Sequence, residues 1–388
     1  MKKFLAFVMA ASMALSLAAC VGSTPASSTA STTTEATSEA AASTSGSKTD
    51  VAFVTDVGNI DDQSFNQYTW QGVQDFCSAN SLNANYYRPT EDSDAARLEQ
   101  MDNAVNDGAK SIVVAGYLFG KAIAEAQEKY PDVQFLALDV SASDLGDKAP
   151  TANTALITYK EEQAGYLAGY AAVYDGYKEL GFLGGMAVPA VIRYGYGFVQ
   201  GADAAAAELG QNIDINYFYG GQFYGDANIT SRMEGWYSNG TQVVFACGGG
   251  IYTSAVEAAL KSNGYVIGVD VDQNYIGVNG VADGSFAYNP FITSAMKGLT
   301  EAVNTALSDI DAGDWGDIAA SNGNFGLEDG DYVGLPTDAD SWNFETFTTD
   351  EYEALKEKIK SGEITVDNSS DDSTKPTVSE FTTVNYIQ

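Results

Sequence analysis

The chain has 388 residues, and 45% of them are hydrophobic, which is enough for buried cores in two or three domains. It carries 52 Asp and Glu against 19 Lys and Arg, a formal net charge of −33, so nucleic acid is not expected as a partner. The absence of histidine excludes Ser-His-Asp catalysis and His-ligated zinc, and 3 cysteines without a CxxC pair exclude a disulfide framework. Neither a metal nor a cofactor is expected.

Residues 1–19 have the pattern of a bacterial secretion signal. Two lysines precede an apolar stretch at 4–17 that is too short for a comfortable membrane span. The signal ends in Leu-Ala-Ala followed by Cys20, which resembles a lipobox, and we expect Cys20 to carry the lipid after cleavage. The alternative is an ordinary secretion signal with an incidental cysteine. Residues 20–50 comprise this cysteine and a Ser/Thr-rich tether, which lacks the apolar surface needed to fold.

From residue 51 onward, short apolar runs alternate with amphipathic segments of helical length. The runs are nearly continuous in Val, Ile, Leu and Phe, which is typical of parallel strands covered on both faces. The predicted strands lie at 51–55, 85–88, 111–115, 134–138 and 155–158 and, in a second series, at 180–183, 213–218, 242–246 and 265–269. The predicted helices lie near 64–80, 93–107, 119–130, 160–175, 191–209, 225–239 and 252–263. This alternation indicates an α/β fold with doubly wound parallel sheets, and its two series indicate two lobes.

The C-terminal part completes the lobes. We expect a strand at 285–288, a helix at 291–312 that ends at Gly313, and a last helix at 342–360. Lobe one is assigned to 51–156 with 284–313, and lobe two to 157–283 with 314–366, with a hinge between them. Residues 367–388 are rich in Ser, Asp and Thr and are expected to form an acidic, polar and weakly structured tail.

Polar residues follow several of the predicted strands. Asp56, Asp139 and Asp270 each come after a strand, and a Cys-Gly-Gly-Gly turn at 247–250 follows another. Ligands of open α/β sheets bind beyond the carboxyl ends of the strands. Polar groups at this place in both lobes favour a cleft that closes around a ligand by hinge motion.

The segment VAFVTDVGNIDDQSFNQYTWQG at 51–72 carries the clearest pattern. It predicts a strand, an acidic glycine turn and then a helix start, where Asp61, Asp62 and Ser64 are placed to cap free N–H groups. Phe65 and Asn66 follow on the first helical turn, facing the strand ends. An aromatic ring beside an amide suits a flat heterocycle, which needs stacking and hydrogen bonds at its edge.

This segment resembles the signature of the BMP family, which comprises the basic-membrane-protein lipoproteins, or PnrA-like substrate-binding proteins of nucleoside ABC importers. Further matches follow in order, and the resemblance covers about residues 50–336: FLALD at 135–139, ACGG at 246–249, VIGVDVDQ at 266–273, TSAMK at 293–297 and FGLED at 325–329. The resemblance implies a type I periplasmic-binding-protein fold and the capture of a purine nucleoside between the lobes.

The resemblance also implies a set of ligand-binding residues. Two phenylalanines sandwich the base in the family, and they match Phe65 and Phe223, with Tyr224 as the next candidate for the second. The family's ribose-binding aspartate and lysine match Asp270 and Lys297. A carboxylate suits this role, because it can accept both O–H groups of a ribose diol. The full predicted set is Asp56, Phe65, Asn66, Asp139, Phe223, Gly249, Asp270 and Lys297. Segment 186–194, which lines the cleft in the family, departs from the purine-binding pattern and leaves the base preference open.

We therefore expect a monomeric lipoprotein, anchored through Cys20 on the extracytoplasmic face of the cell membrane. It would capture a purine nucleoside by hinge closure and deliver it to ABC permease and ATPase subunits. The alternatives are the same fold with a pyrimidine nucleoside, a nucleobase or a sugar, and a sensor that presents its ligand to a membrane receptor. An enzyme such as a nucleoside hydrolase is not expected, because the sequence has neither histidine nor a recognisable metal motif.

Overall fold

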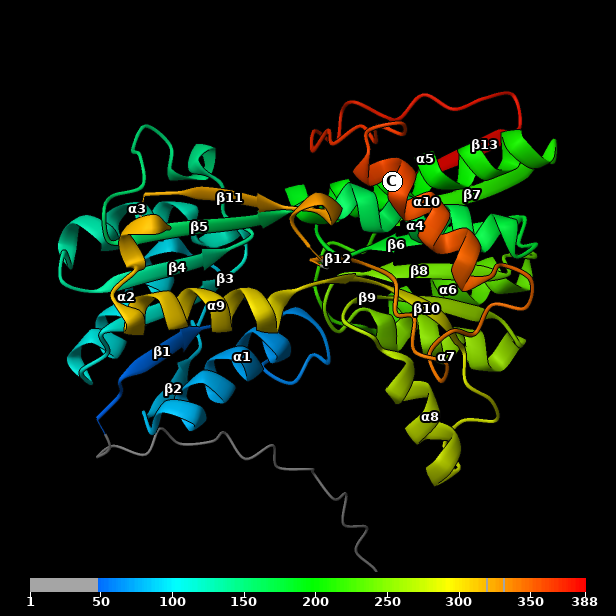
Figure 1. Cartoon of the computed structure of the whole chain (residues 1–388). Helices are drawn as coiled ribbons and strands as arrows, with labels where there is room; N and C mark the ends of the chain where they lie inside the picture. Colours follow the sequence, from blue (N-terminus) through cyan, green and yellow to red (C-terminus); the bar gives the residue numbers. More distant parts are fainter. Residues whose placement is uncertain (1–47, 319, 331) are drawn as a thin grey trace, which may run out of the picture. The chain divides into compact units, whose positions relative to one another are not determined.

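The computed structural model describes residues 48–318, 320–330 and 332–388, which build two β-sheets flanked by helices (Figure 1). The predicted signal at 1–19, the lipidation site Cys20 and all of the tether before residue 48 lie outside the described residues. Among the described helices, none combines the length and the apolar character that crossing a membrane requires.

The first sheet has parallel strands in the order β11-β5-β4-β3-β1-β2. Successive residues of β1 point into different cores, Val51 and Phe53 into one and Ala52 and Val54 into the other. Helices α1 and α9 pack together on the first face, and α2 and α3 pack together on the second. The bounds are β1 Val51–Val54, α1 Phe65–Asn80, β2 Ala84–Tyr87, α2 Asp94–Asn106, β3 Ser111–Ala115, α3 Gly120–Lys129, β4 Gln134–Leu138, β5 Thr154–Tyr159, α9 Leu299–Ala312 and β11 Asn322–Phe325.

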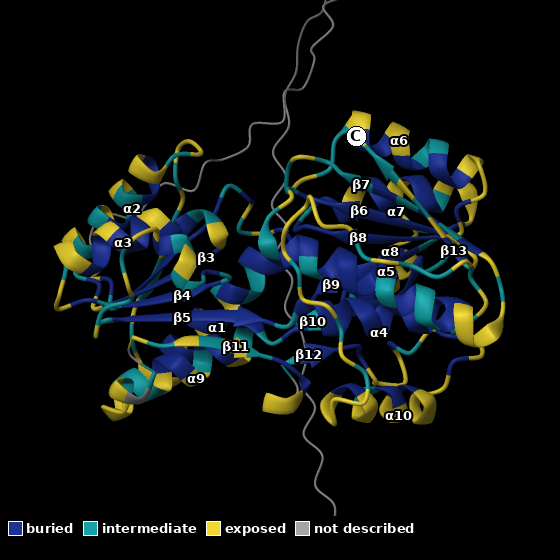
Figure 2. Cartoon of the chain, turned by 90° about the horizontal axis from the view of Figure 1, so that it is seen from above, coloured by how far each residue is buried: buried dark blue, intermediate teal, exposed yellow. Residues whose placement is uncertain are grey.

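The second sheet has the order β12-β10-β9-β8-β6-β7-β13, in which only β12 runs antiparallel to its neighbour. Helices α4 and α5 cover one face and α6 and α7 the other, so the strands lie buried between helices. The outer surfaces of α6 and α7 are exposed, whereas α4 is buried along almost its whole length (Figure 2). The bounds are α4 Glu161–Tyr174, β6 Glu179–Gly184, α5 Pro189–Leu209, β7 Ile213–Tyr219, α6 Ala227–Ser238, β8 Val243–Cys247, α7 Tyr252–Ser262, β9 Tyr265–Asp270, α8 Asn274–Asp283, β10 Phe291–Lys297, β12 Val333–Gly334, α10 Thr349–Lys360 and β13 Thr382–Ile387.

The chain passes between the sheets after β5, after β10 and after β11. Backbone hydrogen bonds join these crossing segments: the N–H of Lys160 donates to the carbonyl of Phe325 at 2.8 Å, and the N–H of Gly298 donates to the carbonyl of Tyr332 at 2.8 Å. The crossings are therefore linked to one another, which is the arrangement expected of a hinge.

The chain between residues 284 and 325 differs from the prediction. Residues 291–297, expected to be helical, form β10, and α9 begins only at Leu299, although it ends at Gly313 as predicted. β10 pairs within the second sheet although 284–313 was assigned to lobe one, and β11 pairs within the first although 314–366 was assigned to lobe two. The physical reason is that β10 is buried on both faces, so its apolar run cannot be distinguished from a buried helix by periodicity.

The predicted strand at 285–288 is also wrong. In its place lies an irregular segment in which Phe286 packs against Gly280 of α8, a helix that was not predicted. Tyr288 donates hydrogen bonds to the carbonyls of Ala259 and Gly264, which anchors the segment to α7. Two glycines within α8 weaken the helical signal of its sequence.

The C-terminal region is more ordered than predicted. The last helix begins at Thr349 instead of 342, because the Thr348 hydroxyl caps it by accepting from the N–H of Glu351. The tail at 367–388 was expected to be weakly structured, yet β13 pairs in parallel with β7 along its whole length. The strand sequence TTVNYI is rich in β-branched and aromatic residues, a signal that the surrounding Ser and Asp residues obscured.

Candidate ligand-binding site

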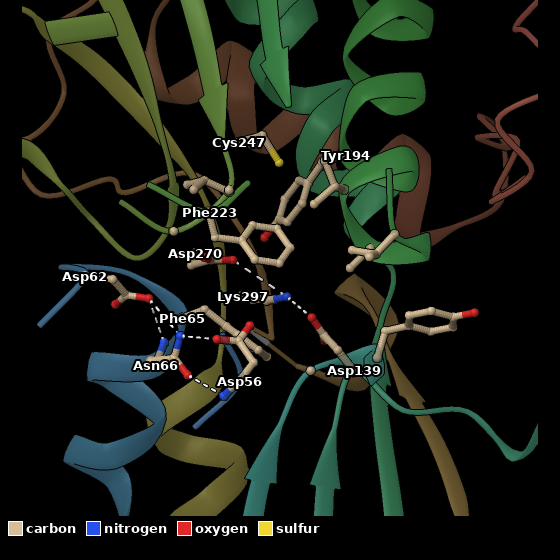
Figure 3. A pocket seen from close by; sticks show the side chains of 18 of the residues that line it. Asp56, Asp62, Phe65, Asn66, Asp139, Tyr194, Phe223, Cys247, Asp270 and Lys297 are labelled. Carbon is tan, nitrogen blue, oxygen red and sulfur yellow. Dashed lines mark hydrogen bonds and ion pairs between the residues drawn. The ribbon is translucent and has the colours of Figure 1, made fainter. Parts of the chain in front are cut away.

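A cavity lies where strands of both sheets end, with about 600 Å³ of empty space that includes open solvent. Figure 3 shows its polar and aromatic lining converging from the two sheets. Every residue of the predicted set lines this cavity: Asp56, Phe65, Asn66 and Asp139 from the first sheet and its loops, and Phe223, Gly249, Asp270 and Lys297 from the second. The structure therefore brings together residues that are up to 241 positions apart, since 297 − 56 = 241.

Two carboxylates fix the amide of Asn66 at the start of α1. Its Nδ2 donates to Oδ1 of Asp56 at 2.8 Å and to Oδ2 of Asp62 at 3.2 Å. The N–H of Gly58 donates to the same Asp56 oxygen at 2.6 Å. Within the described part of the chain, Oδ2 of Asp56 accepts no hydrogen bond, so it is available to a donor in the cavity.

Asp62 caps α1, as the sequence predicted, and it also lines the cavity, which the sequence did not predict. Its carboxylate accepts from the N–H groups of Ser64 at 2.9 Å, Asn66 at 3.0 Å and Gln67 at 3.1 Å. The expected cap by the Ser64 side chain is wrong, because its hydroxyl instead donates to Oδ2 of Asp270 at 2.5 Å. That bond joins the first turn of α1 to the end of β9.

Two phenylalanine rings reach the cavity from different sheets. Phe65 is the first residue of α1, and Phe223 lies in the loop between β7 and α6. Tyr224, the alternative to Phe223, is 51% exposed and is not among the described lining residues. Gly185 makes room for the ring of Phe223, because a Cβ at that position would lie 2.6 Å from the ring. The glycine therefore lets the ring lie against the end of β6.

Lys297 is the electrostatic centre of the cavity wall. Its Nζ lies 2.6 Å from Oδ2 of Asp139, 3.6 Å from Oδ1 of Asp270 and 3.6 Å from Oε1 of Glu161, and all of these side chains are buried. The ammonium also lies 4.5 Å from the ring centroid of Phe65, within the range of a cation–π interaction. One cation thus links carboxylates of both sheets to the aromatic ring.

The backbone at two of these carboxylates is left-handed. Asp139 has φ 55° and Asp270 has φ 68°, a conformation that residues other than glycine seldom adopt. Each residue stands where a strand reaches the cavity. Such conformations gather at ligand sites, where the surrounding structure holds them in place. Here they turn both side chains towards Lys297.

Burial raises the pKa of the carboxyl groups around the cavity. It raises the pKa of Asp62 to about 6, although three backbone N–H groups oppose the change. It also raises the pKa of Asp139 to about 6, against the opposing effect of Lys297. The pKa of Asp56 and the pKa of Asp270 are raised for the same reason.

The charge balance of the cavity disfavours an anionic ligand. Burial by itself lowers the pKa of Lys297, but Asp139, Asp270 and Glu161 outweigh this effect and raise it, so the ammonium stays charged. Its charge is already matched by these carboxylates. A phosphate would meet further carboxylates and no unmatched lysine or arginine among the described lining residues.

Further contacts join the sheets beside the cavity. Nε2 of Gln273, which precedes α8, donates to the carbonyl of Gln63 at 3.0 Å, and the hydroxyl of Tyr275 donates to the side-chain oxygen of the same glutamine. These contacts, with the bond from Ser64 to Asp270, hold the loop before α1 against the second sheet.

Sequence reasoning missed part of the lining. Residues 116–118 directly follow β3, so the rule that ligands bind at strand ends could have identified them. Segment 186–194, which the family resemblance placed along the cleft, does line the cavity, through Val188, Ala190, Val191 and Tyr194. The lining residues outside the predicted set are Asp62, Gly116, Tyr117, Leu118, Val188, Ala190, Val191, Tyr194, Cys247, Gly248 and Val269.

Solved structures with a similar fold are binding proteins and regulators. A solute-binding protein of an ABC transporter system from Aeropyrum pernix K1 matches with a TM-score of 0.70 and 20% identity, over 84% of this chain and 95% of the other. The Lac repressor bound to ONPG matches with a TM-score of 0.51 and 12% identity, over 75% of this chain and 81% of the other. At these identities the matches show the fold alone, which is the α/β type I periplasmic-binding-protein fold.

Sequence comparison identifies the family. Residues 49–370 match the Bmp family model, described as ABC transporter substrate-binding protein PnrA-like. The ABC transporter nucleoside-binding protein BmpA of Lactococcus lactis subsp. cremoris is 30% identical over 69% of this chain and 76% of its own length. A CD4+ T-cell-stimulating antigen of Listeria innocua is 31% identical over 81% of this chain and 87% of its own length. The chain therefore belongs to the Bmp family of PnrA-like ABC transporter substrate-binding proteins, a family of binding proteins and not of enzymes.

Proposed function

We propose that this substrate-binding protein captures a purine nucleoside in the cavity between its two sheets. The observation that carries the proposal is the pair of phenylalanine rings, Phe65 and Phe223, which reach one cavity from different sheets. A flat base stacked on such rings gains roughly 1–3 kcal/mol per aromatic contact. The nucleoside-binding relative in Lactococcus lactis supports the same class of ligand for this chain.

Polar groups on the cavity wall match the two parts of a nucleoside. Oδ2 of Asp56 lies beside Phe65, where it can accept from the N–H groups of a base, while Asn66 holds the other oxygen of this carboxylate. Asp270 and Lys297 supply an acceptor and a donor for sugar hydroxyls. The carboxylate-rich wall favours a neutral nucleoside over a nucleotide.

Ligand binding would favour closure of the hinge. The proposed binding residues come from both sheets, so a ligand that contacts all of them stabilises the closed arrangement and shifts the population towards it. Closed protein would then deliver the nucleoside to the permease of the transporter, which works with an ATPase subunit. Cys20, in the lipobox-like sequence, would anchor the protein on the extracytoplasmic face of the membrane.

The test is calorimetric titration of the refolded, ligand-free protein with inosine. The wild-type chain should bind one inosine per molecule. Asp270→Asn should weaken binding by about tenfold or more, because a charged acceptor is lost from a buried site. Asp272→Asn is the matched control, since Asp272 lies two residues further on and outside the cavity lining. No inosine binding by the wild-type chain would contradict the proposal.

A further inference from the structure

The hydroxyl of Tyr194 is a buried polar group without a partner. Tyr194 is 1% exposed and lines the cavity from α5. Within the described residues, its hydroxyl oxygen is enclosed and makes no hydrogen bond. A buried hydroxyl that stays unpaired costs free energy, so native proteins pair nearly all such groups. A partner supplied by the ligand would remove this cost.

The hydroxyl lies at the Asp270 and Lys297 end of the cavity. Figure 3 shows the ring of Tyr194 pointing from α5 towards these two residues. Nζ of Lys297 is 5.7 Å from the centroid of the ring. After burial, the charge of Asp270 is the largest influence that raises the pKa of Tyr194, which agrees with their proximity. The phenol therefore stays protonated and can both donate and accept a hydrogen bond.

The ring is held firmly in this position. It packs edge-on against Phe245 of β8, with the ring centroids 5.9 Å apart. The backbone of α5 at Tyr194 lies directly against Gly165 of α4, where a Cβ would come within 2.2 Å of the Tyr194 carbonyl oxygen. The Tyr194 hydroxyl extends from a helix that packs tightly against its neighbour, so it has little freedom to reach another partner. Such preorganisation is what a specificity-determining group requires.

A second unpaired atom belongs to another residue that lines the cavity. Oδ1 of Asp139 is buried and has no hydrogen-bond partner among the described residues, while its Oδ2 accepts from Lys297. The cavity wall thus offers an unpaired acceptor from the first sheet and an unpaired hydroxyl from the second. A ligand that carries adjacent hydroxyl groups, such as a ribose diol, can pair with both.

We propose that the Tyr194 hydroxyl binds the 2′,3′-diol of the ribose together with Asp270, and so selects ribonucleosides over deoxyribonucleosides. This assignment rests on the proposed function and adds to it the sugar that the site accepts. A site built to pair a ligand hydroxyl discriminates strongly against an analogue that lacks it, because its own polar groups are then left unpaired. Here the Tyr194 hydroxyl is the group that a missing ligand hydroxyl would leave unpaired, whereas Asp270 keeps Ser64 and Lys297.

The test combines one variant with a series of ligands. Wild-type protein and Tyr194→Phe are titrated with inosine, 2′-deoxyinosine, 3′-deoxyinosine and 5′-deoxyinosine. The wild-type chain should bind at least one of the 2′- and 3′-deoxynucleosides about tenfold more weakly than inosine. Tyr194→Phe should weaken the binding of inosine and of 5′-deoxyinosine by about tenfold. It should weaken the binding of the deoxynucleoside that the wild-type chain discriminates against by no more than about twofold. The selectivity would then collapse in the variant.

Tyr196→Phe is the matched control. Tyr196 is on the same helix and is also 1% exposed, but its hydroxyl donates to the carbonyl of Asp371, away from the cavity. This variant should keep the wild-type selectivity, and thermal unfolding of both variants checks that they fold. Equal affinity of the wild-type chain for inosine and both the 2′- and 3′-deoxynucleosides would overturn the proposal without any variant. An equal loss of affinity for every ligand in Tyr194→Phe would also overturn the proposal. If the wild-type chain binds inosine but shows either of these results, the proposed function stands and only the role of Tyr194 is overturned. If the wild-type chain does not bind inosine, the proposed function and the role of Tyr194 are both overturned.

Discussion

Nζ of Lys297 lies 2.6 Å from Oδ2 of Asp139, so that the end of β10 in the second sheet is tied to the end of β4 in the first. Both side chains are buried, and the same ammonium lies 3.6 Å from Asp270 and from Glu161. A buried charge is tolerated only where it is paired. The cavity wall therefore depends on this lysine for its stability.

Replacing Lys297 should destabilise the protein strongly. Lys297→Met leaves the buried carboxylates of Asp139 and Asp270 without their cation, although Glu161 keeps Arg193 at 2.6 Å, and it should lower the free energy of unfolding by about 3–5 kcal/mol. Urea unfolding measures this change. Lys261→Met is the control, because Lys261 is 53% exposed in its pairs with Glu234 and Glu257, and its replacement should change the free energy of unfolding far less. Equal effects of the two variants would mean that the buried network contributes little.

Replacing Phe65 should affect ligand affinity more than replacing Phe76, the other phenylalanine of α1. Phe65→Leu removes a stacking face and should weaken inosine binding by about tenfold, equivalent to about 1.4 kcal/mol. Phe76→Leu is the matched control, since Phe76 is 5% exposed on the same helix but does not line the cavity. It should lower the stability and leave the dissociation constant within about twofold of the wild-type value. If both variants bound inosine like the wild-type chain, stacking on Phe65 would have to be abandoned.

Glu162 should make the stability of the protein depend on pH. It is 3% exposed, and burial raises its pKa to about 7, with a further contribution from Glu161 and opposing ones from Arg193 and Lys160. A raised pKa means that the folded state favours the protonated acid. The stabilisation is therefore fully present below the unfolded value of 4.5 and is lost as the pH rises through about 7.

Glu162→Gln should remove this dependence. Between pH 5 and pH 8, the wild-type chain should lose about 2 kcal/mol more stability than Glu162→Gln does. Urea unfolding at the two pH values provides the comparison, with Glu125→Gln on the exposed face of α3 as the control. Parallel pH profiles for all three proteins would show that Glu162 does not titrate in this range.

The C-terminal strand should protect the edge of the second sheet. β13 covers β7 along its length, and Tyr386 packs on Tyr217 with ring centroids 5.1 Å apart. Deletion of residues 382–388 exposes the edge of β7 and should lower the free energy of unfolding by about 1–3 kcal/mol and promote association. Thermal unfolding and light scattering measure these effects. Unchanged stability and a monodisperse deletion variant would show that β13 is dispensable.

Much of the fold was accessible from the sequence because most strands are continuous apolar runs. β3 and β8 are buried at every position, and no other reading of such short runs between helical segments is plausible. The prediction was wrong for β10, which Gly298 alone separates from α9, and for β13, whose partner β7 lies about 170 residues earlier. Neither fact is contained in the local pattern.

The predicted part of the site came from residues at strand ends and from the family motifs. Asp139 and Asp270 end strands, and their left-handed backbone could not be read from residue type. Tyr194 was indicated only as part of segment 186–194 in the family resemblance, because a tyrosine within a buried helix has by itself the pattern of a core residue. Such residues depend on tertiary structure, which one sequence does not display.

The central claim is that the cavity between Phe65 and Phe223 binds a purine nucleoside. Calorimetric titration of the refolded wild-type chain with inosine, guanosine, adenosine, uridine, cytidine, hypoxanthine and ribose tests it most directly. We predict binding of purine nucleosides at one site, with weaker binding of the pyrimidine nucleosides and of the separate base and sugar, since each of these forgoes part of the contacts. Preferential binding of uridine, cytidine, hypoxanthine or ribose, or no binding of any purine nucleoside, would contradict the claim.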